Sequence, residues 1–86
     1  MLSDVMANAK VGELWITNQA HPNIADVASV KELCGILLAN GRTPYPDTLE
    51  RAEREGTPIL GSHLTAFELT SRIGKMLAAG GLRSES

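Results

Sequence analysis

The sequence predicts an α/β domain: a small three-layer structure of βα repeats, with at least three parallel strands and helices on both faces of the sheet. Three short apolar runs carry this prediction, at residues 14–16, 36–39 and 59–60. Each run is followed by a polar loop and then by a capped helical segment, and right-handed connections are expected between the strands. The loops therefore meet at the carboxyl ends of the strands, where open α/β sheets bind ligands. They cover residues 18–23, 40–46 and 61–65.

The first two predicted elements are a helix and a strand. Ser3 can cap a short helix that runs to about Ala9, and Gly12 ends it. Residues 13–17 form the first strand, because a continuous apolar centre is typical of a strand covered on both faces. A leading helix and a thin three-stranded sheet indicate that the chain begins late relative to a complete domain, or that a partner subunit supplies a strand.

The second predicted helix begins at Asn23, with Asp26 three residues later in the capping-box position. Gly35 ends this helix, and residues 36–39 form the second strand. Cys34 is expected to be a buried small apolar side chain. Apolar side chains repeat every three residues along the helix and define its buried face. They are Ile24, Val27, Val30 and Leu33, with Ala25 and Ala28 widening the face.

The third predicted helix starts at the threonine–proline pair of residues 43–44, or nearer Asp47, because a residue before proline disfavours helical backbone. Leu49 and Ala52 are expected to face inward, and Gly56 ends the helix. Two ion pairs at i,i+4 spacing are each worth about 0.2–0.5 kcal/mol. They are Asp47–Arg51 and Glu50–Arg54.

The third strand is predicted over residues 57–60, with Pro58 near its start, where a missing amide donor is tolerated. Thr65 and Glu68 form a capping box at the start of the last helix. The apolar stripe of this helix consists of Leu69, Ile73, Met76 and Leu77, and Gly80 ends it. One domain is therefore expected over residues 1–79, with a loose tail over residues 80–86.

Composition limits the classes of function. A chain of 86 residues buries only roughly 60% of its unfolded surface, which favours dimerisation. The net charge of -2, the pI of about 5.6 and the scattered basic residues disfavour nucleic-acid binding. One cysteine and two histidines allow neither an internal disulfide nor a metal cluster by spacing, and no segment resembles a membrane span. The chain is expected to be cytoplasmic, with no metal and no cofactor.

Seven polar residues of the three loops are the candidate ligand contacts. His21 and His63 can each hydrogen-bond a ligand or act as an acid or base near neutral pH, and Arg42, beside Gly41, can bind a phosphate or carboxylate. The helix after Arg42 lacks an acid in its first three predicted positions, which favours an anion at its N-terminus. The contacts are Asn18, Gln19, His21, Arg42, Ser62, His63 and Thr65, of which Thr65 chiefly caps its helix.

Each candidate also has a purely structural interpretation. The histidines can bond to local carbonyl groups, and Arg42 can be solvated or paired with an acid. Trp15, in the middle of a strand, is expected in the core, whereas Tyr45, between two prolines, is the better surface aromatic. Neither G-x-x-x-x-G-K-[ST] nor G-x-G-x-x-G occurs, and the three loops contain no lysine. No catalytic residue is therefore predicted.

Residues 2–77 resemble a DRTGG domain, a small α/β module found at the N-terminal side of HPr kinase/phosphatase and phosphotransacetylase and as free-standing proteins. The resemblance rests on residues 2–9, on residues 15–17 with Gln19, His21 and Asn23, and on residues 41–44, 56–60 and 65–68. It implies a regulatory or ligand-sensing module, often at subunit interfaces, with no established chemistry of its own. The kinase chemistry of HPr kinase resides in a separate P-loop domain, whose motif does not occur here.

The Asp-Arg-Thr-Gly-Gly-like segment that names the family, with the strand before the first helix, has no counterpart in this sequence, so the chain is expected to be N-terminally short relative to the family. The leading interpretation is a non-catalytic regulatory module, expected to be a dimer, that binds a small anionic or nucleotide-like ligand or a partner protein. A purely structural or interaction role is the alternative. Phosphotransfer through a loop histidine ranks third.

Overall fold

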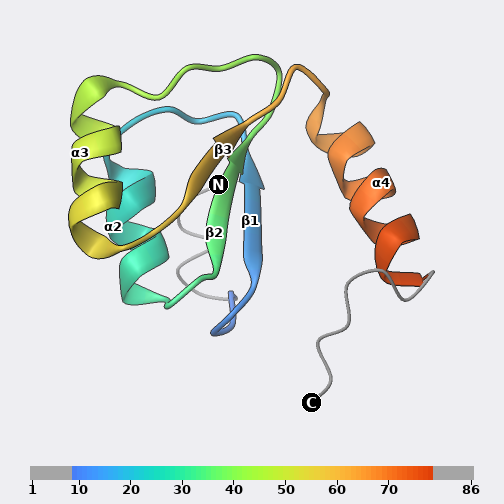
Figure 1. Cartoon of the computed structure of the whole chain (residues 1–86), viewed down its shortest axis with the longest axis horizontal. Coiled ribbons are helices and arrows are strands. Elements are labelled where there is room, and N and C mark those ends of the chain that lie inside the picture. The colour runs from blue at the N-terminus through green and yellow to red at the C-terminus, as the bar shows by residue number, and fades with distance from the viewer. Residues whose placement is uncertain (1–8, 79–86) are drawn as a thin grey trace.

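The computed structural model describes residues 9–78 as a three-stranded parallel sheet with three helices (Figure 1). The elements in chain order are β1 (Leu14–Thr17), α2 (Asn23–Val30), β2 (Gly35–Leu38), α3 (Pro46–Glu55), β3 (Ile59–Gly61) and α4 (Ala66–Ala78). The strand order is β1-β2-β3, and both neighbouring pairs are parallel. The predicted α/β class is confirmed. The helix expected from Ser3, the stop at Gly80 and the tail lie outside the described residues.

The helices lie on both sides of the sheet. Helices α2 and α3 pack against each other on one side, and α4 packs against β1 on the other (Figure 1). The strand register places Trp15, Ile36 and Ile59 in one row, and all three belong to the core beneath α2. Because side chains alternate along a strand, Ile16 and Leu60 point to the opposite face. We call this opposite side the outer face of the sheet.

The core is small and lies between α2 and the sheet. Ile24, Ile36 and Leu38 are its largest fully buried apolar side chains. Each contributes about 1.5–3 kcal/mol when removed from water. Trp15 is half-buried and packs against this cluster, as predicted. The core therefore fixes the sheet and α2, and leaves the loops at the carboxyl ends of the strands on the surface.

Helix α2 ends earlier than its apolar stripe predicts. It stops at Val30, whose side chain is 67% exposed, so the predicted burial of Val30 is wrong. Glu32 adopts a left-handed backbone with φ of 54°, and the Leu33 N–H donates to the Ala28 carbonyl at 2.9 Å. This turn ends the helix, which Gly35 was expected to do; Gly35 instead begins β2. The turn also leaves Cys34 exposed, contrary to its predicted burial.

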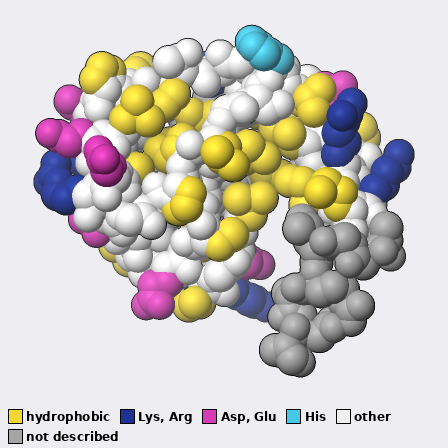
Figure 2. All heavy atoms as spheres, viewed as in Figure 1, with side chains coloured by type: hydrophobic (Ala, Val, Ile, Leu, Met, Phe, Trp, Pro, Cys, Tyr) yellow, Lys and Arg dark blue, Asp and Glu magenta, His cyan; other side chains and the backbone are white. Residues whose placement is uncertain are grey.

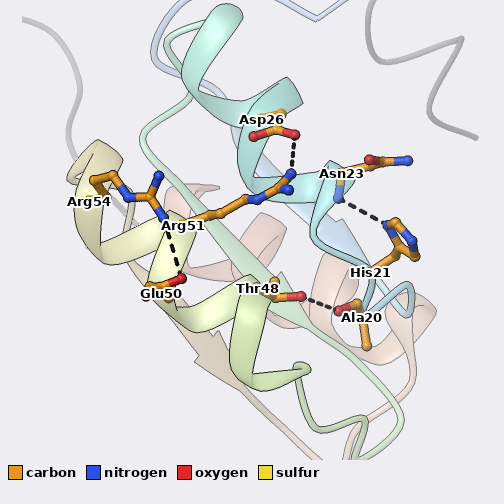
Figure 3. A network of polar contacts seen from close by, with 8 residues as sticks. All are labelled: Ala20, His21, Asn23, Asp26, Thr48, Glu50, Arg51 and Arg54. Atoms are coloured by element: carbon orange, nitrogen blue, oxygen red, sulfur yellow. Dashed lines mark hydrogen bonds and ion pairs between the residues drawn. The ribbon is translucent and has the colours of Figure 1, made fainter.

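Helix α3 begins at Pro46, between the two predicted starts, and ends at left-handed Gly56 as predicted. Thr48 is fully buried in place of the expected Leu49, which is about half exposed. The predicted pairing of Arg51 with Asp47 is wrong, because Arg51 reaches across to Asp26 of α2 at 2.7 Å (Figure 3). The Glu50–Arg54 pair forms, with an N–O distance of 3.4 Å. Long-range pairing between neighbouring helices replaces one of the two local pairs.

None of the helices within residues 9–78 has the length and apolar character needed to cross a membrane. The cytoplasmic location stays a prediction from the sequence.

Candidate functional site

A shallow pocket opens at the carboxyl ends of β2 and β3, where the loops that follow these strands meet. Its volume is about 230 Å³. Three of its residues follow β2 and three come from the end of β3 and the loop after it. They are Gly41, Arg42, Thr43, Gly61, Ser62 and His63. The structure thus brings together Arg42, Ser62 and His63 of the seven predicted contacts, and we call this place the Arg42–His63 pocket.

Backbone hydrogen bonds tie the two loops of this pocket together. The Gly41 N–H donates to the Ser62 carbonyl and the Asn40 N–H to the Leu64 carbonyl, both at 2.8 Å. The Ser62 N–H continues the β2–β3 ladder by donating to the Leu38 carbonyl at 2.9 Å. The loops therefore extend the sheet beyond its last strand residues, and the pocket rests on an ordered frame.

Gly41 makes the close approach between the two loops possible. Its φ of +68° lies in the left-handed region, and a Cβ atom there would stand 2.9 Å from the His63 Nδ1. Asn40 shares the left-handed conformation, with φ of 61°. A side chain at position 41 would have to adopt a left-handed backbone and would also force the exposed His63 ring to shift, because this ring lies close to the backbone of the neighbouring loop.

The charge of the pocket comes from Arg42. No carboxylate lines it, and within residues 9–78 Arg42 takes part in no ion pair. The backbone amides of Asn40, Gly41 and Arg42 all donate within the protein. An anion would thus be held by side-chain donors: the Arg42 guanidinium, the His63 imidazole and the Ser62 hydroxyl.

The prediction that the first turn of the following helix lacks an acid is wrong. Since α3 begins at Pro46, Asp47 lies in its first turn and places a negative charge at the positive end of the helix dipole. The expectation depended on a start at residue 43, which would have put Asp47 beyond the first three positions. The pocket is therefore a site of side chains, not of a helix terminus.

Three other predicted contacts, Asn18, Gln19 and His21, follow β1 and do not line this pocket. The Asn23 N–H donates to His21 Nδ1 at 3.2 Å, so His21 serves the start of α2, where Asn23 was expected to be the cap (Figure 3). The Gln19 N–H donates to the Thr17 hydroxyl at 3.1 Å, and Asn18 is exposed. In the order β1-β2-β3, the strand β2 separates these residues from the loop after β3.

Thr65 has the capping role that the sequence predicts. The Glu68 N–H donates to the Thr65 hydroxyl at 3.0 Å, and the Thr65 N–H donates to the Glu68 carboxylate at 2.9 Å. The bond from the Thr65 backbone, followed by the Thr65 side chain, lowers the pKa of Glu68 from its ordinary value. Thr65 thus fixes the start of α4 just beyond the pocket.

Thr48 is a buried supporting residue at this edge of the sheet that the sequence analysis missed. Its hydroxyl donates to the Ala20 carbonyl at 2.7 Å, and the Tyr45 N–H reaches the same oxygen at 3.4 Å (Figure 3). These bonds join the loop after β1 to the start of α3. Thr48 lies four residues before Ala52, the other buried side chain of α3, and this helical spacing is the signal that could have identified it.

No protein-family model, curated protein or solved structure matches this chain. Residues 9–78 contain no group of three or more His, Cys, Asp and Glu side chains arranged to hold a metal ion. The chemistry of the site therefore has to be argued from Arg42, Ser62 and His63 themselves.

Proposed function

We propose that this protein is a non-catalytic sensing module that binds a small anion in the Arg42–His63 pocket. The observation that carries the proposal is the meeting of Arg42, Ser62 and His63 in one concave place free of carboxylates. An arginine next to further hydrogen-bond donors suits phosphate or carboxylate groups, because charge-assisted bonds are about twice as strong as neutral ones. The position at the carboxyl ends of parallel strands also supports it.

The regulatory role of the proposal follows from the resemblance to DRTGG domains. A module that senses a ligand has to bind it and transmit binding to a partner or a second copy. The pocket joins the loops after β2 and β3, so a bound anion would stiffen the link between these two strands. Anion binding would then change the stiffness of the surface that a partner on the β3 side of the sheet contacts.

Thermal unfolding with inorganic phosphate and pyrophosphate tests the anion site. Binding to the folded state alone stabilises it by about 2.7 kcal/mol when the free ligand is at 100 times its Kd. We expect the Tm of the wild-type protein to rise with anion concentration, and the Arg42→Ala variant to lose this rise. Arg54→Ala, which removes an exposed arginine of α3, is the matched control and should keep it.

Chloride at equal ionic strength separates specific binding from general salt effects. A rise in Tm that survives in Arg42→Ala would place the anion elsewhere and refute the pocket. Absence of any rise with phosphate or pyrophosphate in the wild-type protein would refute the anion proposal itself.

We also propose that the protein is a dimer. The apolar row on the outer face becomes more exposed toward β3: Ile16 and Leu37 are half-buried, and Leu60 is 65% exposed. Helix α4 packs against β1, at the far end of this row. A second copy that covers Leu60 would complete the burial, and the size of the chain favours such association.

A further inference from the structure

The segment that leaves the Arg42–His63 pocket leads directly to a pair of aromatic rings. Tyr45 lies three residues after Arg42, and its side chain is 49% exposed. The rings of Tyr45 and His21 meet edge to face, with their centroids 6.3 Å apart and an interplanar angle of 65°. Arg42 and the exposed ring of Tyr45 thus lie along the loop after β2, and His21 lies beside Tyr45 on the loop after β1.

The spacing between these two places is held by prolines. Pro44 fixes its own φ, and each residue before a proline is pushed toward extended backbone. Tyr45, which precedes Pro46, has φ of -65° and ψ of 154°, the polyproline II conformation. Three residues of extended chain span at most about 11 Å, which limits the distance between Arg42 and Tyr45. A ligand in which a ribose joins a phosphate group to a base is short enough to fit within this limit.

Hydrogen bonds to the loop after β1 also fix the backbone position of Tyr45. Its N–H and the buried Thr48 hydroxyl both reach the Ala20 carbonyl, at 3.4 and 2.7 Å. An aromatic side chain whose backbone is already ordered loses little conformational entropy when a planar ligand stacks on it. Tyr45 is therefore a prepared stacking surface, in contrast to an aromatic ring on a mobile segment.

His21 adds a hydrogen-bonding group of known polarity. Because its Nδ1 accepts the Asn23 N–H, the proton of the neutral ring is on Nε2 (Figure 3). His21 is exposed, and a donor on its ring suits the ring nitrogens and carbonyl oxygens that acceptor edges of nucleobases present.

We infer that the ligand of the site is a nucleoside phosphate, with its phosphate group at Arg42 and His63 and its base on Tyr45 beside His21. This inference rests on the proposed anion site and extends it by naming the ligand class. Base stacking on an aromatic side chain is worth about 1–3 kcal/mol. The base should therefore raise the affinity by about tenfold or more over that of the sugar phosphate alone.

Calorimetric titration with adenosine 5′-monophosphate, ribose 5-phosphate and adenosine tests the inference. We expect the monophosphate to bind about tenfold or more tightly than ribose 5-phosphate, and adenosine to bind weakly. Tyr45→Ala should reduce the affinity for the monophosphate to that for ribose 5-phosphate and leave the latter unchanged, which also reports an intact fold. Tyr45→Phe should keep the difference. Phe67→Ala, at an exposed aromatic side chain of α4, is the matched control and should keep it too.

The outcomes distinguish the inference from the anion proposal. Equal affinities for the monophosphate and ribose 5-phosphate, or an advantage of the base that survives in Tyr45→Ala, would overturn the inference and leave the anion site standing. Failure of inorganic phosphate and of both sugar phosphates to bind would overturn both. A 5′-phosphorylated oligonucleotide should bind no more tightly than the mononucleotide, given the net charge of -2; tighter binding would overturn the assignment to a free nucleotide.

Discussion

Thr48 is a polar side chain in a fully buried position, and its hydroxyl joins α3 to the loop after β1 through the Ala20 carbonyl. In Thr48→Val the shape of the side chain is kept while the hydroxyl is lost, so the carbonyl keeps only the longer bond from Tyr45. We expect the free energy of unfolding to fall by about 0.5–1.5 kcal/mol, the net contribution of the hydrogen bond that is lost. Denaturant unfolding measures this loss, and Thr48→Ser, which keeps the hydroxyl, should lose less. A larger loss in Thr48→Ser would mean that packing dominates at this position.

Two features favour glycine at position 41: its left-handed backbone and the close approach of the His63 ring. An L-residue with left-handed backbone costs roughly 1–2 kcal/mol. Gly56→Ala should show this cost alone, because its φ is +72° and a Cβ atom there meets nothing within 4 Å. Gly41→Ala should lose about 0.5–1.5 kcal/mol more, since its Cβ atom would force the exposed ring of His63 away from its position.

The double variant Gly41→Ala with His63→Ala separates the two costs of Gly41. Removal of the imidazole should return the loss to that of Gly56→Ala, as measured by denaturant unfolding. Equal losses in the two single glycine variants would show that the exposed His63 ring moves aside without cost, and that its contact with Gly41 does not hold the ring in place.

Helices α2 and α3 end in the same type of turn, but different residues occupy its left-handed position. In each turn, the N–H of the left-handed residue donates to the carbonyl three positions earlier. The N–H of the next residue donates to the carbonyl five positions before it, at 2.9 Å in α2 and 2.8 Å in α3. This is the Schellman motif, which favours glycine. Helix α3 has Gly56 in the left-handed position and α2 has Glu32.

Replacement of Glu32 by glycine should therefore stabilise the protein. Relief of the left-handed strain gives about 1–2 kcal/mol, and the more flexible unfolded chain takes back about 0.4–1 kcal/mol. The expected gain is about 0.5–1 kcal/mol in chemical unfolding. Glu53→Gly, within α3, is the control and should lose about 1 kcal/mol. If both variants lose stability alike, Glu32 makes a compensating contact in the native protein.

Local signals in the sequence predicted the elements well and their exact faces less well. The capping box of Thr65 and Glu68 and the stop at Gly56 depend on neighbours in sequence, and both formed as predicted. The buried face of α2 and the partner of Arg51 depend on tertiary packing, which periodicity does not contain. Glutamate is not a residue that marks the left-handed position of a Schellman motif, so the end of α2 at Val30 could not be predicted from the sequence.

The site was predictable to the same degree. The alternation of apolar runs and polar loops placed the three loops at one edge of a parallel sheet, and the parallel pairing is confirmed. The order of strands is not encoded in this alternation. With β2 in the centre, the loop after β2 can meet the loop after either neighbour: it forms the Arg42–His63 pocket with the loop after β3, and it contacts the loop after β1 through Tyr45.

On the scale of the whole molecule, the outer face of the sheet is the surface where we propose that a second copy binds. Apolar side chains extend from the strands toward α4 in the view of Figure 2. The strand β3 is an edge strand, and its residues Ile59–Gly61 include no charge that would discourage pairing with another chain. Both features lie around Leu60, which makes this residue the place to interrupt a dimer.

Sedimentation velocity over a concentration series tests the proposed dimer with two matched variants. Leu60→Asp places a charge on the outer face of β3, where the side chain is 65% exposed. Val30→Asp places the same charge at a 67% exposed position on α2, in the opposite layer. We expect the wild-type protein and Val30→Asp to sediment as dimers and Leu60→Asp as a folded monomer, because a buried unpaired charge is costly at an apolar interface. A wild-type protein that stays monomeric at the highest concentration would rule the dimer out, and dimers in all three proteins would move the interface away from Leu60.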